Sequence, residues 1–281
     1  MRYFNFLIKL YFKCHKKYDY DYYNNLITNQ KNEKIVPKLC IKDYRLDNNI
    51  YYFNINSNSN TIIIYMHGGA YLDTFSKYHF KYLKRLIKKT NANVIAPNYG
   101  LIPFYSYKDA FDKYIPIIKN IIDNKGDKKV IFMGDSAGGG LILSMYQYLK
   151  NNNYNLPEKL VLLSPWVDIN LSHLTVTNKD VKDPWINVSR LKVCARLWAS
   201  DLSLDDYKVS PINGNINLCN TLMIFGTNEL LYPTLLKMKE SLDKDNTNKT
   251  IIGKGMLHVY PILPLIGNNK ILKEISEFIN K

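Results

Sequence analysis

Short apolar runs alternate with longer amphipathic segments along most of the chain. Five runs have the length and the continuous apolar character of strands that are buried on both faces: 61–65, 94–96, 129–133, 159–163 and 221–225. Four segments alternate with them and repeat apolar residues at the helical spacing of about 3.6 residues: 78–89, 108–123, 137–150 and 233–243. This pattern predicts an α/β fold, in which a mostly parallel, doubly wound sheet carries helices on both faces.

Two regions depart from the alternation. Runs at 35–44 and 50–55, separated by Asp47, Asn48 and Asn49, predict an antiparallel hairpin that leads into the sheet. The stretch from about 170 to 217 is predicted to contain helix and loop without a strand, so we expect an insertion over one end of the sheet.

In the middle of the chain an apolar strand runs through a glycine-rich turn into a helix. The turn is Gly134-Asp135-Ser136-Ala137-Gly138, a G-x-S-x-G sequence whose outer glycines permit a tight strand-to-helix turn. Such a turn holds the serine in a strained, exposed conformation that suits a nucleophile. A phosphate-binding loop is the alternative interpretation, but the run lacks the lysine that a P-loop requires. We predict that Ser136 is a nucleophile supported by Gly134, Asp135 and Gly138.

A second glycine-rich turn follows the first predicted strand. Its sequence His67-Gly68-Gly69-Ala70 is similar to an HGGG-type loop, whose backbone N–H groups bind the oxyanion of a tetrahedral intermediate. Glycine suits this role because the backbone itself must approach the substrate oxygen. We expect donors from Gly68 and Gly69, together with Ala137 at the helix N-terminus. His67 is either a catalytic base or a residue that orients the loop, and we favour the second interpretation.

The base that serves Ser136 is expected near the C-terminus, in the chain order Ser, acid, His. Among the five histidines, only His258 follows the last predicted strands, in a loop after a β-run near 250–252. The sequence therefore predicts His258 as the base.

The acid should follow a strand and precede His258. Between the insertion and the helix 233–243, Glu229 is the only carboxylate, and it lies just beyond the strand 221–225. A glutamate can hold the imidazole tautomer as an aspartate does. Glu229 is thus the assignment by elimination, while three residues of the insertion remain as alternatives: Asp201, Asp205 and Asp206.

Composition narrows the class of protein. Hydrophobic residues make up 46% and charged residues 22% of the chain, which favours a folded globular protein over a disordered or collagen-like one. The 38 basic against 24 acidic residues give a formal net charge of +14. This charge fits an anionic membrane or a phosphate-binding surface, but the basic residues are dispersed, as a codon bias would leave them. No basic and aromatic stripe indicates nucleic-acid binding.

The cysteines and the N-terminus bear on compartment and partners. Four separated cysteines without a CxxC pair predict neither a zinc site nor a disulfide framework, and they fit a reducing, cytoplasmic compartment: Cys14, Cys40, Cys194 and Cys219. We expect no cofactor and no metal. Residues 1–12 contain an apolar face at helical spacing that either docks on the protein or rests weakly on a membrane surface.

Taken together, these motifs resemble those of the hormone-sensitive-lipase-like (α/β-hydrolase fold-3) group of esterases. The resemblance extends from about residue 61 to the C-terminus. Further motifs occur in the expected order: Ser164-Pro165-Trp166-Val167-Asp168, Lys182-Asp183-Pro184-Trp185, Gly226-Thr227-Asn228-Glu229 and Gly255-Met256-Leu257-His258. Ala70 departs from the third glycine of the HGGG loop.

The resemblance implies an α/β-hydrolase domain, 34–281, with a cap built from the N-terminal segment 1–33 and the insertion at about 170–217. It implies a serine carboxylic-ester hydrolase that acts through a Ser-His-Glu triad and an acyl-enzyme on a small-molecule ester. Two alternatives are an amide hydrolase with the same triad and a non-catalytic protein that binds a membrane surface or another ligand.

Overall fold

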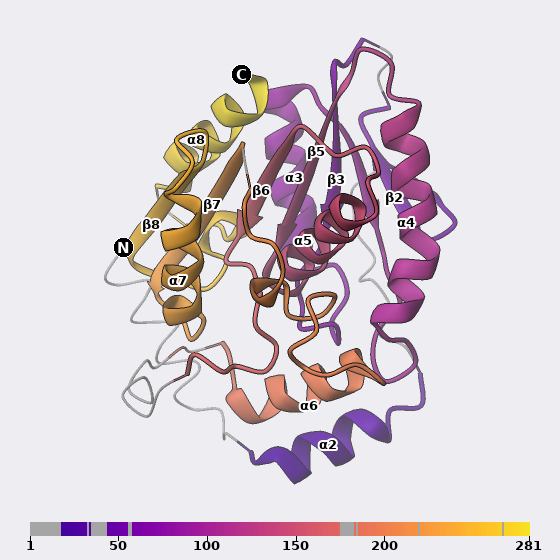
Figure 1. Cartoon of the computed structure of the whole chain (residues 1–281), viewed down its shortest axis with the longest axis vertical. Coiled ribbons are helices and arrows are strands. Elements are labelled where there is room, and N and C mark those ends of the chain that lie inside the picture. The colour runs from indigo at the N-terminus through magenta and orange to yellow at the C-terminus, as the bar shows by residue number, and fades with distance from the viewer. Residues whose placement is uncertain are drawn as a thin grey trace.

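The computed structural model describes residues 18–32, 34, 44–55, 58–174, 183, 185–218, 220–265 and 267–281 (Figure 1). The predicted apolar face at 1–12 lies outside these residues, as do Cys14, Cys40 and Cys219. Among the helices of the described ranges, none combines the length and the apolar character needed to cross a membrane.

One twisted sheet forms the centre of the molecule. Its strands, in chain order, are β1 (Tyr44–Asp47), β2 (Ile50–Phe53), β3 (Thr61–Met66), β4 (Asn93–Pro97), β5 (Lys129–Asp135), β6 (Lys159–Leu163), β7 (Thr221–Asn228) and β8 (Lys249–Leu257). The spatial order is β1-β2-β4-β3-β5-β6-β7-β8, and every pair from β4 to β8 is parallel. The predicted α/β fold with a mostly parallel sheet is confirmed.

A hairpin is present as β1 and β2, with a turn shorter than predicted. Of the predicted run 35–44, only Tyr44, which begins β1, lies within the described residues. Asp47 belongs to β1 and pairs with Ile50, so the turn consists of Asn48 and Asn49 alone. Both asparagines have left-handed backbones, with φ of 48° and 61°. A two-residue turn with two positive φ angles matches the twist of the paired strands, and asparagine tolerates this conformation.

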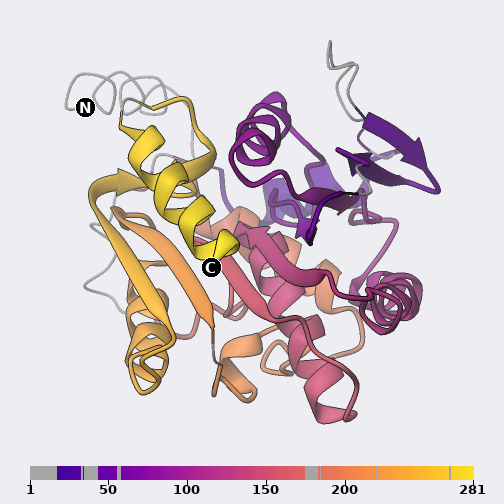
Figure 2. The same cartoon turned by 90° about the horizontal axis from the view of Figure 1, so that it is seen from above.

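Helices cover both faces of the sheet. Those with counterparts in the sequence prediction are α3 (Lys77–Thr90), α4 (Tyr107–Asp123), α5 (Ser136–Asn151) and α7 (Tyr232–Leu242), and α8 (Asn268–Asn280) ends the chain. The core is divided accordingly, since α3 and α8 pack with one set of strand residues and α4, α5 and α7 with the other (Figure 2). On β5, for example, Phe132 faces the second group and Ile131 the first, because successive side chains of a strand point to opposite faces.

Two further helices lie beyond the carboxyl ends of the parallel strands (Figure 1). They are α2 (Tyr20–Thr28) and α6 (Val188–Ala199), and they pack against each other. They fall in the segments 1–33 and 170–217 from which we predicted a cap. As expected, the described part of 170–217 contains helix and loop but no strand. The division into a cap and a main domain stays a prediction.

Candidate active site

The chain turns directly from β5 into α5 between Asp135 and Ser136. Ser136 lies there with φ of 49°, a left-handed backbone conformation that residues other than glycine rarely adopt. Close packing explains the two flanking glycines. A Cβ on Gly138 would lie 2.2 Å from the carbonyl oxygen of Met66, and one on Gly134 would lie 2.6 Å from that of Gly138. The turn therefore holds the Ser136 hydroxyl outward at the N-terminus of α5, as the G-x-S-x-G pattern predicted.

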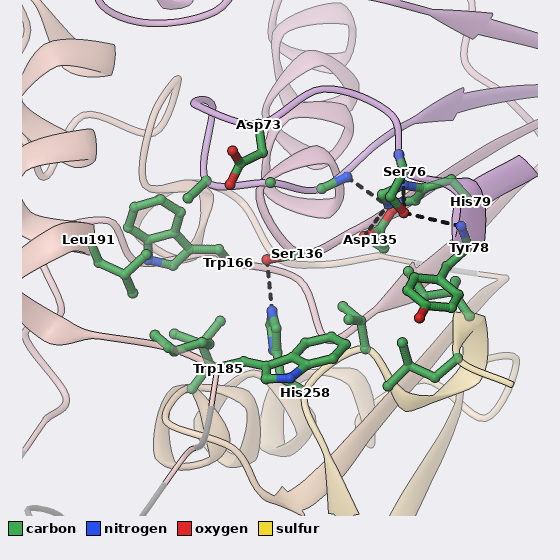
Figure 3. A pocket seen from close by; sticks show the side chains of 18 of the residues that line it. Asp73, Ser76, Tyr78, His79, Asp135, Ser136, Trp166, Trp185, Leu191 and His258 are labelled. Carbon is green, nitrogen blue, oxygen red and sulfur yellow. Dashed lines mark hydrogen bonds and ion pairs between the residues drawn. The ribbon is translucent and has the colours of Figure 1, made fainter. Parts of the chain in front are cut away.

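Three residues that are far apart in the chain form a line of hydrogen bonds at this turn. The distance from His258 Nε2 to Ser136 Oγ is 2.8 Å (Figure 3). The distance from His258 Nδ1 to Glu229 Oε2 is 2.7 Å. Glu229 and His258 are both buried. None of the alternative acids contacts His258: Asp201, Asp205 and Asp206 bond to other residues.

The second oxygen of Glu229 is fixed from the opposite side. Oε1 accepts hydrogen bonds from the Gly226 amide at 2.6 Å and from the Ser164 hydroxyl at 3.0 Å. Ser164 in turn accepts one from the Val259 amide at 3.1 Å. The carboxylate can therefore present only Oε2 to His258. Ser164 was part of a recognised motif, but the sequence did not indicate that it orients the acid.

These surroundings set the pKa of His258. Burial alone would lower its pKa, but the hydrogen bond and the charge of Glu229 outweigh burial, with smaller contributions from Asp183 and Asp135. The pKa of His258 is thus raised above its ordinary value, because the carboxylate stabilises the imidazolium form.

Asp183 connects the insertion to the loop that carries Glu229. Its Oδ2 accepts a hydrogen bond from the Leu230 amide at 2.9 Å, and its Oδ1 accepts from the amides of Trp185 and Ile186. Because Leu230 directly follows Glu229, the buried Asp183 carboxylate holds the acid loop against the inserted segment.

The prediction that the Gly68 amide binds an oxyanion is not supported. This N–H donates to Asp135 Oδ1 at 3.0 Å, so it is already engaged within the protein. The next two residues, Gly69 and Ala70, line the same cavity as Ser136. Within the described ranges their amides, like that of Ala137, have no hydrogen-bond acceptor. We therefore assign Gly69, Ala70 and Ala137 as the candidate oxyanion donors.

The two residues after Gly68 both have positive φ angles. Gly69 has φ of 125° and Ala70 has φ of 55°, while the amides of Leu72 and Asp73 close a tight turn on the Gly69 carbonyl. A Cβ on Gly69 would lie 2.3 Å from the Asp73 carbonyl oxygen, so the second glycine of the motif is sterically required. Ala70 adopts a left-handed conformation despite its Cβ.

His67 contacts the loop rather than Ser136. Its Nδ1 donates to the Gly68 carbonyl at 2.7 Å, and its ring stacks on Tyr99 with centroids 4.3 Å apart. Burial, followed by the nearby His79, lowers the pKa of His67 to about 4. A neutral, stacked ring agrees with the predicted role in orienting the loop.

Asp135 connects the serine turn, the glycine loop and helix α3. In addition to the Gly68 amide, its Oδ1 accepts from the Tyr65 hydroxyl at 2.5 Å, and its Oδ2 lies 3.3 Å from His79 Nε2. The Ser76 amide donates to His79 Nδ1, so Nε2 carries the proton of that ring. Burial alone would raise the pKa of Asp135, but His79, Tyr65 and Gly68 lower it below its ordinary value. No sequence motif indicated His79.

Ser136 opens into a cavity of about 240 Å³ (Figure 3). Trp166 and Leu191 lie on one side of the serine and Tyr78 on the other, and Trp185 lines the same cavity as His258. Trp198, the third tryptophan of the chain, does not line this cavity but stacks on Tyr71 in the core, with ring centroids 4.1 Å apart. Within the described part of the chain, no three His, Cys, Asp or Glu side chains group as metal ligands.

Comparisons with known proteins agree with this architecture. A model of the alpha/beta hydrolase fold family matches residues 63–262. An esterase of Acinetobacter venetianus is 25% identical over 186 residues, which cover 65% of this chain and 61% of the relative. Human hormone-sensitive lipase is 23% identical over 176 residues, which cover 59% of this chain and 16% of the lipase.

Among solved structures, a hormone-sensitive lipase from a metagenome library superposes with a TM-score of 0.81 at 22% identity, covering 99% of this chain and 97% of that one. The family match spans well over half of the chain. The protein therefore belongs to the alpha/beta hydrolase fold family.

Proposed function

We propose that the protein hydrolyses small carboxylic esters through an acyl-enzyme on Ser136. The observation that carries the proposal is the hydrogen-bonded line from Glu229 through His258 to Ser136, with distances of 2.7 and 2.8 Å, at the wall of a cavity. This is the arrangement that nucleophilic acyl transfer requires, in which a base contacts the nucleophile and a third group orients the base. Relatives described as esterases and lipases support the same reaction.

In the first half of the reaction, His258 Nε2 takes the Ser136 proton as Oγ attacks the ester carbonyl carbon. The carbonyl oxygen becomes an oxyanion, which the amides of Gly69, Ala70 and Ala137 stabilise. The tetrahedral intermediate collapses, the bond to the alcohol oxygen breaks, and His258 gives its proton to the departing alcohol. Water then attacks the acyl-enzyme with His258 as base, and the carboxylic acid and the free serine are released.

The size of the cavity predicts a preference for short acyl chains. Its volume of about 240 Å³ is below the usual range of ligand pockets, roughly 300–1,000 Å³. We expect kcat/KM for p-nitrophenyl esters to be highest from acetyl to butyryl and to fall about tenfold or more at octanoyl, because displacing packed walls costs about 1–3 kcal/mol. Hydrolysis rates along the acyl series, measured with purified protein, check this expectation.

Trp185→Ala provides a matched test of the same idea. Trp185 lines the cavity and is only partly buried, so its truncation should enlarge the site and move the optimum to longer chains. An optimum at long acyl chains in the unmodified protein would contradict the assignment to small esters. Absence of turnover with any ester by the folded protein would contradict the proposed function itself.

Asp135→Asn is expected to lower kcat by about ten- to a hundredfold, the equivalent of the roughly 1–3 kcal/mol that an unsatisfied buried polar group costs. Two donors, the Gly68 amide and the Tyr65 hydroxyl, fix the oxygen of the new amide at the Oδ1 position. Its NH₂ group then faces the N–H of His79, and the repulsion displaces the loop. Steady-state kinetics of Asp135→Asn and of the exposed control Asp127→Asn test this, and an unchanged kcat in Asp135→Asn would refute it.

A further inference from the structure

An ion-pair cluster lies at the edge of the cavity and takes no part in the acyl transfer described above. Asp73 Oδ2 lies 2.5 Å from Arg190 Nη2, and Asp73 Oδ1 forms an ion pair with Lys34. Asp73 comes from the loop that carries Gly69 and Ala70, whereas Arg190 lies in the first turn of α6. Two cations therefore share one carboxylate, which leaves the cluster with an excess positive charge.

The two cations lie on different sides of Asp73. Arg190 and Asp73 line the cavity of Ser136, whereas Lys34 lines a neighbouring depression together with Asn98 and Tyr105. Burial alone would raise the pKa of Asp73, but Arg190 and Lys34 lower it, so the carboxylate is charged and neutralises one of its two partners. The uncompensated charge thus borders the cavity at Arg190.

The guanidinium of Arg190 has capacity for a further ligand. A guanidinium carries five N–H donors in a planar fork that matches a carboxylate. Within the described ranges, its only hydrogen bond is the one to Asp73. The side chain is 32% exposed, so it is held in place yet open to the cavity.

The position of the cluster relative to the reacting atoms sets the size of the ligand. Asp73 and Arg190 line the cavity of Ser136, and so do the apolar side chains of Trp166 and Leu191 (Figure 3). The polar cluster and this apolar wall therefore border the same small cavity. A substrate whose ester carbonyl contacts Ser136 can reach Arg190 with a substituent only a few bonds away.

We propose that Arg190 forms an anion subsite that selects esters bearing a carboxylate group. This inference rests on the proposed ester hydrolysis and names its substrate class. The carboxylate of the substrate binds the unused N–H groups of Arg190, while Lys34 keeps Asp73 neutralised from the other side.

The test compares charged and neutral esters in matched pairs. One pair places the carboxylate on the alcohol side: 4-acetoxybenzoate against 4-acetoxybenzamide. The other places it on the acyl side: mono-4-nitrophenyl fumarate against 4-nitrophenyl (E)-2-pentenoate. In the fumarate, the trans double bond stops the free carboxylate from attacking its own ester. For each pair, the ratio of kcat/KM for the charged to the neutral ester is measured in each variant, so intrinsic reactivity cancels between variants.

In Arg190→Met this ratio should fall about tenfold in at least one pair, since a charge-assisted hydrogen bond in a hydrated cavity contributes about one decade of affinity. Arg190→Lys should keep part of the preference, because it retains the charge but not the planar fork. Arg196→Met, at an exposed position on the same helix and away from the cavity, removes the same charge and should leave the ratio unchanged. Added salt should reduce the preference of the unmodified protein.

Asp73→Asn supplies a test in the opposite direction that does not depend on removing Arg190. It frees the guanidinium and removes a negative charge from the cavity, so the preference for the charged ester should rise. Equal ratios in unmodified protein, Arg190→Met and Asp73→Asn would overturn the subsite. Equal ratios together with Ser136-dependent hydrolysis of neutral esters would leave the proposed function intact. Absence of all ester turnover in the unmodified protein would contradict both proposals.

Discussion

Ser136→Ala should lower kcat/KM for p-nitrophenyl acetate by on the order of 10⁶-fold, the scale found when a triad hydrolase loses its nucleophile. The variant keeps the cavity and the amides of Gly69, Ala70 and Ala137, so weak turnover above the uncatalysed rate should remain. The measurement is the initial rate at matched protein concentrations, with folding verified by circular dichroism. Replacement of a left-handed serine by alanine adds no atoms, so the fold should persist.

Ser144→Ala is the matched control for this variant. Ser144 lies on the same helix, is buried, and donates to the Tyr207 carbonyl, but it does not line the cavity. Its replacement should leave kcat within about twofold, because the lost hydrogen bond contributes only about 1 kcal/mol to stability and does not act on the reacting atoms. Ester turnover by Ser136→Ala at more than a few per cent of the normal rate would contradict the assignment of Ser136 as nucleophile.

Glu229→Gln should reduce kcat by about 10⁴-fold, by the mechanism seen when the acid of a serine protease triad becomes an amide. The Gly226 amide and the Ser164 hydroxyl require an oxygen at the Oε1 position, so the NH₂ group of the glutamine must face His258 Nδ1. The neutral imidazole then accepts at Nδ1 and carries its proton on Nε2, where it cannot take the Ser136 proton. The variant therefore holds the wrong tautomer.

The same variant should change the pH profile. The base must be neutral to act, so the rate rises with pH through the pKa of His258, which in the unmodified protein lies above its ordinary value. Glu229→Gln removes the main group that raises this pKa and leaves burial, which lowers it. The acidic limb of kcat/KM should therefore move to lower pH, whereas in the exposed control Glu240→Gln on α7 it should stay in place. A limb that does not move would show that Glu229 is not coupled to His258.

The parallel strands were predictable because residues buried on both faces form continuous apolar runs. The ends of those strands were not predictable, because they depend on pairing with a neighbouring strand. Strand β7 continues to Asn228, which pairs with Leu257 of β8. For the same reason β8 reaches Leu257, although the sequence predicted a β-run only near 250–252. Exposed and half-buried positions alternate along this edge strand, which weakens its signal. Helix α8 was missed, even though its buried Leu272, Ile275 and Ile279 follow a helical spacing.

The site residues likewise separate into those that a local pattern identifies and those that depend on distant contacts. Ser136, Glu229 and His258 could be assigned because local motifs and chain order carry the information. The oxyanion donors could not be fully assigned, because the amide that faces the cavity is decided by Asp135, 67 positions away from Gly68. Likewise Arg190 and Asp73 lie 117 positions apart, and no local pattern connects them.

The most direct test of acyl-enzyme formation on Ser136 is its covalent capture. The protein would be treated with a p-nitrophenyl phosphonate ester, followed by intact-mass measurement, tandem mass spectrometry of the digested peptides, and parallel assays of remaining ester turnover. We expect one adduct per chain, located on Ser136, that forms in proportion to the loss of activity and fails to form in Ser136→Ala and in Glu229→Gln over the same time. Inactivation through an adduct on another residue, or full activity after Ser136 has been modified, would contradict it.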